Sequence, residues 1–271
     1  MKVKIMNIIL VIMFFILLLI LYVLFGYRNK LNGSNEWFSS NEYICHALCG
    51  IDGLDYMNSL DGLEYGYSMG IKIMEVDLLY TSDFLIVANH YWDNSKILSY
   101  DDFMNNKIYN RYSRIDMEIL IDYMLKYKDL YIVIDTKEDD YSDNYINIYK
   151  ELVDYCLSID STLLDRIIIQ LYSYDMYYDI KDIYEFDNYI FTLYKFTDFN
   201  MLNIANFCIY NNIDVIAIPE WFIENNYVND SHIKFFKYKG LSVYVYTVND
   251  NNIKNKYYQM GVDGIYTDFL Y

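Results

Sequence analysis

Short apolar runs alternate with amphipathic stretches over most of the chain, and this alternation leaves few folds that the chain can adopt. Segments with apolar residues at helical spacing include Ser59–Tyr67, Met117–Leu125, Tyr145–Ser158 and Asn200–Tyr210. Nine runs have the length and composition of strands: Tyr43–Cys45, Ile71–Leu79, Leu85–Ala88, Leu130–Ile134, Ile167–Leu171, Tyr189–Leu193, Asp214–Ile218, Leu241–Thr247 and Gly264–Tyr266. Such alternation over about 240 residues predicts an α/β fold with a parallel sheet, and it suits a (β/α)8 barrel of the TIM type.

The number of strand candidates exceeds that of such a barrel by one, and one connection is very short. Only a link around Thr81-Ser82-Asp83 joins Ile71–Leu79 to Leu85–Ala88, whereas a parallel crossover needs about a dozen residues. We therefore expect a local hairpin or an irregular barrel segment there. The rival fold is an open doubly wound sheet. No GxGxxG or GxxxxGK loop follows any of the runs, which disfavours a nucleotide-binding protein.

The composition indicates a folded domain and excludes some partners. The 271 residues are 55% hydrophobic and 19% aromatic, which excludes a wholly disordered protein. A formal charge of −17 repels phosphate backbones, so we do not expect nucleic acid as a partner. We attribute the 34 tyrosines to a general compositional bias and not to a ligand-binding surface.

Residues 5–26 form an almost unbroken apolar segment that is long enough to cross a bilayer as a helix. The alternative is a cleaved signal peptide, but no small-x-small pattern follows the segment. We predict a short cytoplasmic tail at 1–4, a transmembrane anchor at 5–26, a linker at 27–41 and the barrel at 42–271. Two basic residues flank the segment on each side, so charge does not decide its orientation. Because large domains are translocated regardless of charge, we expect a single-pass membrane protein with the barrel outside the cytoplasm.

The four cysteines do not show whether the protein resides in a reducing or an oxidising compartment. Cys45 and Cys49 flank a short turn, and an extended strand would hold their Cα atoms beyond the reach of a disulfide. We expect these two residues, together with Cys156 and Cys208, to be buried thiols. The absence of a CxxC motif from the sequence disfavours a zinc or redox site.

Ionisable and amide side chains recur late in the strand-like runs or directly after them. They are His46, Glu75, Asp77, His90, Asp135, Lys137, Asn249 and Asp268. In a parallel barrel these strand ends share one face, where the loops build the active site. Each piece also has an ordinary structural explanation, such as a surface carboxylate, a structural histidine or a strand-end salt bridge. Two of the only three histidines join the group, however, and the third, His232, receives no role.

This set of side chains supports one kind of chemistry. Glu75, Asp77 and Asp135 offer hard oxygen ligands, which suit Ca²⁺ or Mg²⁺ better than zinc. Glu75 and Asp77 are two positions apart and share a face of their strand, where two carboxylates repel unless a cation lies between them. Two histidines can act as general base and general acid. A lysine adds a point positive charge, and together these groups fit phosphodiester cleavage.

At these residues the chain resembles the glycerophosphodiester phosphodiesterase family, metal-dependent barrels related to phosphatidylinositol-specific phospholipase C. That family has His-Arg-Gly after its first strand, then an Asn that starts a helix, Glu-x-Asp, Thr-x-Asp-Gly, His-Asp, Glu-x-Lys, Trp-Thr-x-Asn and a closing Gly-x-Asp-Gly motif ending in Thr-Asp. The counterparts here are His46-Ala47-Leu48, Asn58-Ser59-Leu60, Glu75-Val76-Asp77, Thr81-Ser82-Asp83-Phe84, His90-Tyr91, Asp135-Thr136-Lys137, Tyr246-Thr247-Val248-Asn249 and Gly261 to Asp268. The similarity covers His46 to Asp268.

The resemblance implies an enzyme that hydrolyses glycerophosphodiesters to glycerol phosphate and an alcohol. In that family a neighbouring substrate hydroxyl can attack phosphorus, and water then opens the cyclic phosphate. By this similarity His46 and His90 would be the acid–base pair. Glu75, Asp77 and Asp135 would hold the divalent cation. The residues that would contact substrate are Lys137, Tyr246 and Asn249.

Several positions depart from the family pattern, so the resemblance does not identify the substrate. Ala47 replaces the Arg after the first His, so a bidentate phosphate contact is missing. Asp135 is one methylene shorter than the family Glu, while Tyr246 replaces a Trp and Phe84 a Gly. Two alternatives therefore remain open. One is a phospholipase C or D type enzyme acting on intact lipid, and the other is a non-catalytic binder of glycerol-phosphate polymers.

Overall fold

The strands close into a barrel in a computed structural model of the protein. The structure describes residues 13–14, 16, 37–39, 41–92, 96–136, 144–195 and 200–271. The chain divides into two units, Met1–Ser40 and Asn41–Tyr271, and the second unit contains every strand described below. Among the described residues no helix is long and apolar enough to span a membrane, and most of the predicted anchor at 5–26 lies outside them.

Eight parallel strands form the barrel, as the alternation predicts. They are β1 (Tyr43–Cys45), β2 (Ile73–Tyr80), β4 (Tyr131–Thr136), β5 (Ile167–Leu171), β6 (Asn188–Thr192), β7 (Val215–Pro219), β8 (Ser242–Tyr246) and β9 (Gly264–Thr267). The first strand pairs with both the second and the last, which closes the sheet. The α/β fold of the TIM type is therefore confirmed.

The ninth strand candidate is a hairpin arm. β3 (Ile86–Ala88) runs antiparallel to β2, with Leu78 paired to Ala88. Thr81 closes the turn, because its Oγ1 donates to Asp83 at 2.7 Å and accepts from the Leu85 amide at 3.0 Å. This confirms the local hairpin, one of the two arrangements expected at the short link. The hairpin also brings the residues after β3 to the rim of the barrel where the parallel strands end.

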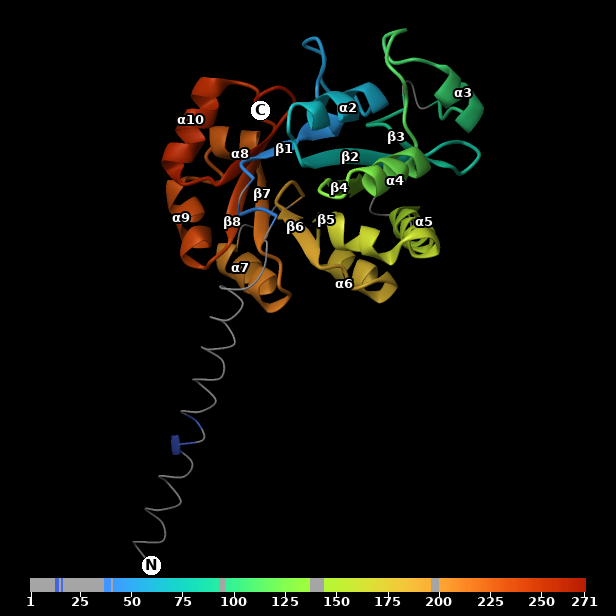
Figure 1. Cartoon of the computed structure of the whole chain (residues 1–271). Helices are drawn as coiled ribbons and strands as arrows, with labels where there is room; N and C mark the ends of the chain where they lie inside the picture. The colour runs from blue at the N-terminus through green and yellow to red at the C-terminus, as the bar shows by residue number, and fades with distance from the viewer. Residues whose placement is uncertain are drawn as a thin grey trace, which may run out of the picture. The chain divides into compact units, whose positions relative to one another are not determined.

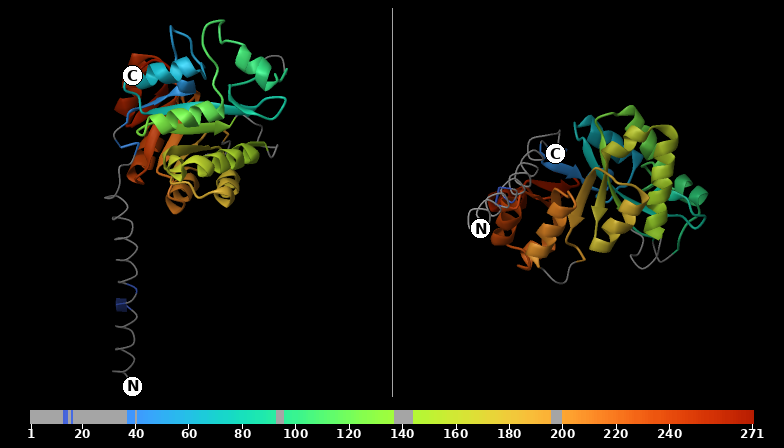
Figure 2. Two further views of the ribbon diagram at one scale, coloured as in Figure 1. Left: turned by 45° about the vertical axis from the view of Figure 1, so that its right-hand side comes forward. Right: turned by 90° about the horizontal axis from the view of Figure 1, so that it is seen from below.

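Helices surround the strands (Figures 1 and 2). They are α2 (Leu60–Ser68), α4 (Met117–Lys126), α5 (Asn144–Ile159), α6 (Tyr174–Ile183), α7 (Met201–Tyr210), α8 (Glu220–Glu224), α9 (Asp230–Tyr238) and α10 (Asn251–Met260), with 3-10 turns η1 (His46–Leu48) and η3 (Ser161–Arg166). The short α3 (Tyr100–Asn105) lies beside β3, at the upper right of Figure 1. Side-chain caps begin many of these helices: Ser59 accepts from the Gly62 amide, and Asp116 from that of Ile119. His232 is part of the capping box of α9, a structural role.

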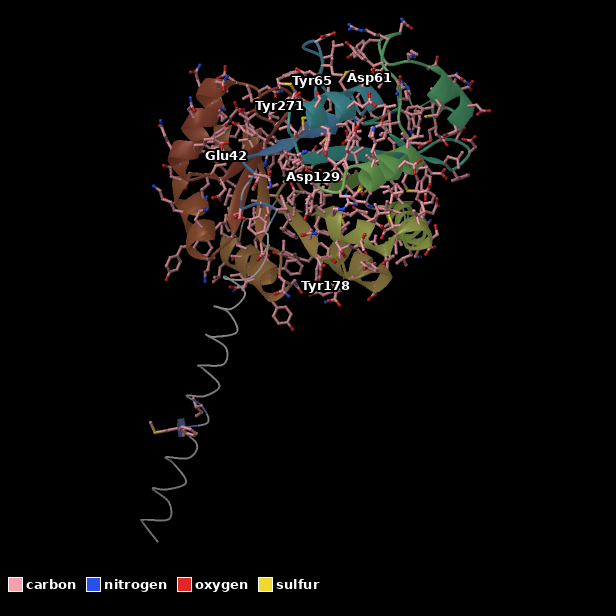
Figure 3. The ribbon with its side chains drawn as sticks, viewed as in Figure 1. Glu42, Asp61, Tyr65, Asp129, Tyr178 and Tyr271 are labelled. Carbon is pink, nitrogen blue, oxygen red and sulfur yellow. A yellow bond between two sulfur atoms is a disulfide. The ribbon has the colours of Figure 1, made fainter. Side chains whose placement is uncertain are left out.

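Two features tie the chain together around the barrel. The buried guanidinium of Arg166 donates to the carbonyls of Met124, Tyr127 and Leu130, so it fastens the end of α4 next to the start of β4. The last residue, Tyr271, lies beside Tyr65 of α2 (Figure 3), with ring centroids 6.4 Å apart. The Arg166 contacts lie at the amino ends of β4 and β5, the face of such a barrel that serves stability.

The expectation of four thiols is wrong for one pair. Cys45 and Cys49 form a disulfide, with Cα atoms 5.0 Å apart. Strand β1 ends at Cys45, and Ala47 and Leu48 then adopt positive φ angles of 46° and 57°, which turn the chain back on itself. The other two cysteines are buried thiols, as expected, and burial raises the pKa of Cys156 to about 12.

Candidate active site

Three buried carboxylates form the centre of the site. Glu75 and Asp77 point to one face of β2, and Asp135 pairs with Asp77 in the ladder of β2 and β4. One oxygen from each lies within 4.8 Å of the others, and none of the three residues is more than 2% exposed. Carboxylates at this spacing repel one another, and burial strengthens the repulsion because water screens it less.

Each carboxylate is positioned by a neutral donor. The Ala47 amide donates to Glu75 Oε2 at 2.8 Å, Asn58 Nδ2 donates to Asp77 Oδ2 at 2.6 Å, and the Tyr172 hydroxyl donates to Asp135 Oδ1 at 2.5 Å. Burial and the charge of Asp135 hold the pKa of the Tyr172 hydroxyl far above its usual range, so the hydroxyl remains a donor. These donors are uncharged and orient the carboxylates. The oxygen-only donor set therefore fits a hard divalent cation such as Ca²⁺ or Mg²⁺.

His46 lies against this acidic centre, directly after β1. Its Nδ1 is 3.0 Å from Asp268 Oδ1, and its Nε2 is 4.0 Å from Glu75 Oε2. Burial alone would lower the pKa of His46, but the hydrogen bond with Asp268 and the charges of the nearby carboxylates raise it to about 9. In the absence of a cation the imidazole is therefore protonated at neutral pH.

Asn249 contacts the carboxylate that holds His46. Its Nδ2 donates to Asp268 Oδ2 at 2.7 Å, and its Oδ1 accepts from the Asp268 amide at 2.9 Å. The predicted substrate contact of Asn249 remains a prediction, since this residue does not line the cavity described next. The geometry shows it as a support for the pair of Asp268 and His46.

His90 follows β3 on the other side of a tyrosine ring. The centroid of Tyr56 is 4.7 Å from that of His46 and 4.7 Å from that of His90. His90 is half-buried, whereas His46 is buried. The two predicted catalytic histidines therefore share one cavity, with Tyr56 between their rings.

A cavity of about 390 Å³ brings most of the predicted residues together at the carboxyl ends of the strands. Its lining includes His46, Glu75, His90, Asp135 and Tyr246. Asp77 does not line the cavity, but one of its oxygens lies within 4.8 Å of oxygens of Glu75 and Asp135. The Tyr246 hydroxyl lies 2.5 Å from Thr192 Oγ1. Lys137, the predicted phosphate contact, lies outside the described residues.

Other residues of the site had no role assigned to them from the sequence, although one of them, Asp268, belongs to the group of polar residues at the strand ends. They are Asn58, Asp268, Tyr56, Gln170, Tyr172 and Lys195. Asn58 and Asp268 carried a signal, because one starts a helix and the other follows the last strand within motifs that resemble the family's. Gln170 and Tyr172 are polar groups at the end of a strand-like run, which is a weaker signal. No local pattern singled out Lys195, whose Nζ lies 5.0 Å from the centroid of the Tyr172 ring.

The protein is a parallel barrel whose cavity adjoins a buried cluster of three carboxylates that could hold a divalent cation. The chain belongs to the glycerophosphoryl diester phosphodiesterase family, which matches residues 40–271. Members of this family hydrolyse glycerophosphodiesters and use a divalent metal, and the chain is accordingly a phosphoric diester hydrolase.

Solved structures share the fold at low sequence identity. A glycerophosphodiester phosphodiesterase from Parabacteroides distasonis is 17% identical, with a TM-score of 0.64 over 84% of this chain and 92% of that one. A phosphodiesterase from Oleispira antarctica, in complex with the product sn-glycerol-3-phosphate, is 15% identical, with a TM-score of 0.66 over 86% and 95%. An enzyme from Thermotoga maritima is 18% identical, with a TM-score of 0.54 over 84% and 94%. No curated protein matches the chain.

Proposed function

We propose that this enzyme hydrolyses small glycerophosphodiesters to glycerol phosphate and an alcohol, with His46 and His90 as the acid–base pair. The observation that carries this proposal is the placement of both histidines and the carboxylate cluster in one cavity. Glu75, Asp77 and Asp135 would hold Ca²⁺ or Mg²⁺. When bound, the cation would draw charge from the phosphoryl oxygens and make phosphorus easier to attack.

The side chains of the site have distinct tasks in this reaction. Asp268 holds Nδ1 of His46, so Nε2 is the nitrogen that exchanges a proton within the cavity. One histidine takes a proton from the attacking hydroxyl, and the other gives a proton to the leaving alkoxide. If a hydroxyl of the glycerol attacks first, the alcohol leaves, and water then opens the cyclic phosphate with the proton transfers reversed. The net reaction consumes one water molecule for each diester.

The phosphate needs a positive side chain as well as the cation. Ala47 cannot supply the contact that an Arg would make at this position. Among the described residues that line the cavity, Lys195 is the one lysine or arginine. We infer that Lys195, together with Lys137 as predicted from the sequence, contacts phosphate oxygens and compensates for Ala47.

Phosphorus NMR of the purified full chain tests the reaction. The substrates are glycerophosphocholine, glycerophosphoethanolamine and glycerophosphoglycerol, each with Ca²⁺, with Mg²⁺ and with a chelator. We expect the diester resonance to be replaced by that of glycerol phosphate only when a divalent cation is present. Turnover confined to intact phospholipid, with release of diacylglycerol or phosphatidic acid, would instead assign a phospholipase. A folded chain that binds the cation but cleaves neither class would indicate a binder of glycerol-phosphate polymers.

We also propose that residues 5–26 anchor the enzyme in a membrane, with the barrel outside the cytoplasm. The length and apolarity of this segment support the proposal. After expression in a bacterium, the full chain is expected to stay with membranes through a carbonate wash, and a chain lacking residues 1–30 to be released. External protease is expected to digest the barrel of the anchored chain in spheroplasts. Recovery of the full chain in the carbonate supernatant would refute the anchor, and protection from protease would reverse its orientation.

A further inference from the structure

A second hollow of about 440 Å³ adjoins the active-site cavity. Tyr56 and His90 line both, so the two spaces meet at these residues. The remaining wall comes from the loop before α2, with Asp55 and Met57, and from the segment after β3, which includes Lys107 and Arg114. We call this hollow the side pocket. Its position beside a predicted catalytic histidine makes it a candidate place for part of the substrate.

The charge of the side pocket is opposite to that of the chain. Lys107 and Arg114 line it together with one carboxylate, Asp55, whereas the whole chain carries a formal charge of −17. Two cations against one anion leave a local excess of positive charge. A cationic hollow on so acidic a protein would attract an anionic group and disfavour an ammonium group such as that of choline.

The two cations are held on ordered backbone. Ile108 and Tyr112 exchange backbone hydrogen bonds of 3.0 Å in both directions, which makes a small hairpin next to Lys107. Asp52 accepts from the Tyr112 hydroxyl at 2.7 Å and pairs with Arg111 at 2.6 Å, so the hairpin is tied to the loop after β1. The Arg114 guanidinium lies over the Phe103 ring, 4.1 Å from its centroid. Because the backbone that carries these side chains is already held in place, less conformational entropy is lost when a ligand binds.

Tyrosines supply the rest of the recognition surface. Tyr91 and Tyr109 also line the side pocket and are 65% and 62% exposed, and Tyr56 is 46% exposed. Phenol hydroxyls beside a lysine and an arginine suit phosphate oxygens and the hydroxyls of a polyol. The lining therefore combines two cationic side chains with phenol hydroxyls.

We propose that the side pocket binds a second phosphate, carried by the alcohol arm of the substrate. This inference rests on the proposed function: the diester phosphate lies at the carboxylate cluster, the glycerol lies toward Tyr246, and the other arm passes Tyr56 and His90. The favoured substrates are then glycerophosphodiesters whose alcohol is itself phosphorylated. Such an alcohol could be a phosphorylated cyclitol or a further glycerol-phosphate unit.

Two matched substrate pairs test the proposal in the full chain. Glycerophosphoinositol is compared with glycerophosphoinositol 4-phosphate, and glycerophosphoglycerol with its terminally phosphorylated form. We expect kcat/KM to be at least about tenfold higher for the phosphorylated member of one or both pairs, since the free energy of a charge-assisted hydrogen bond corresponds to a change of this size. The pair with the larger ratio identifies the source of the phosphate. Raising the salt concentration is expected to reduce the ratio.

Substitutions locate the effect in the side pocket. Lys107→Gln and Arg114→Gln are each expected to lower the ratio about fivefold to tenfold. Lys96→Gln is the matched control, because Lys96 is an exposed residue that does not line the pocket, and both rates should stay unchanged. If Arg114→Gln fails to fold because the stacking on Phe103 is lost, the exposed Lys107 still provides the test.

The outcomes separate this proposal from the proposed function. Cleavage of all four diesters with equal kcat/KM within each pair overturns the side-pocket proposal and leaves the function standing. The same holds if a preference exists but Lys107→Gln and Arg114→Gln leave it unchanged, or if glycerophosphocholine is the best substrate. Failure of the folded, cation-loaded chain to cleave any diester overturns both.

Discussion

Replacing His46 with alanine is expected to lower kcat about 10²–10⁴-fold, the usual contribution of a positioned general acid or base. The imidazole is held between Asp268 and Glu75 at the edge of the carboxylate cluster, so no other described side chain can take its place there. The measurement is steady-state turnover of glycerophosphoglycerol with saturating cation. His232→Gln is the matched control, because it removes a histidine but keeps a side chain that can complete the capping box of α9. A His46→Ala enzyme with wild-type kcat would remove this residue from the chemistry.

A second variant tests whether the negative charge of Asp268 helps to set the pKa of His46. Asp268→Asn keeps an oxygen that can accept from Nδ1 of His46 but removes the negative charge. Because that charge helps to raise the pKa of His46, His46 in the variant is expected to lose its proton at lower pH. The pH dependence of kcat/KM should therefore shift toward lower pH. A profile that falls in amplitude without moving would indicate a purely structural role for Asp268.

Removing the divalent cation is expected to abolish activity and to lower the thermal stability of the enzyme. A ligand at about 100 times its Kd stabilises the folded state by about 2.7 kcal/mol. In a domain of this size that corresponds to a change in Tm of about 5–10 °C. Thermal melting and turnover, each measured with chelator and then with added Ca²⁺ or Mg²⁺, check the prediction. Full activity in chelator with no change in Tm on addition of either ion would contradict a cation site.

The variant Asp135→Asn separates loss of the cation from loss of the fold. It keeps an oxygen that can accept from Tyr172 but removes one of three mutually repelling carboxylates. Without cation it is expected to be at least as stable as the wild type, whereas the cation should raise its Tm by less than about 2 °C. Asp122→Asn, on the exposed face of α4, is the control and should respond to cation as the wild type does. A variant that melts well below the metal-free wild type would show that Asp135 is structural.

The order and kind of the barrel's elements could be predicted from local sequence patterns. Apolar runs and amphipathic stretches are local signals. The short link at 81–83 excluded a parallel crossover, and the structure shows a hairpin arm there. Because the carboxyl ends of parallel strands meet at one face, the sequence also predicted that Glu75, Asp77 and Asp135 would come together, and the structure places their oxygens within 4.8 Å.

Other features depend on contacts between distant segments, which local patterns do not show. Only the pairing of β1 with β9 brings Asp268 against His46 across 222 positions of sequence. The disulfide of Cys45 and Cys49 depends on the positive φ angles of the turn after β1, which side-chain patterns do not encode. The side pocket arises where the segment after β3 folds back beside the loop after β1. Contacts of this kind are set by the packing of segments far apart in the sequence, so they could not be predicted from local patterns.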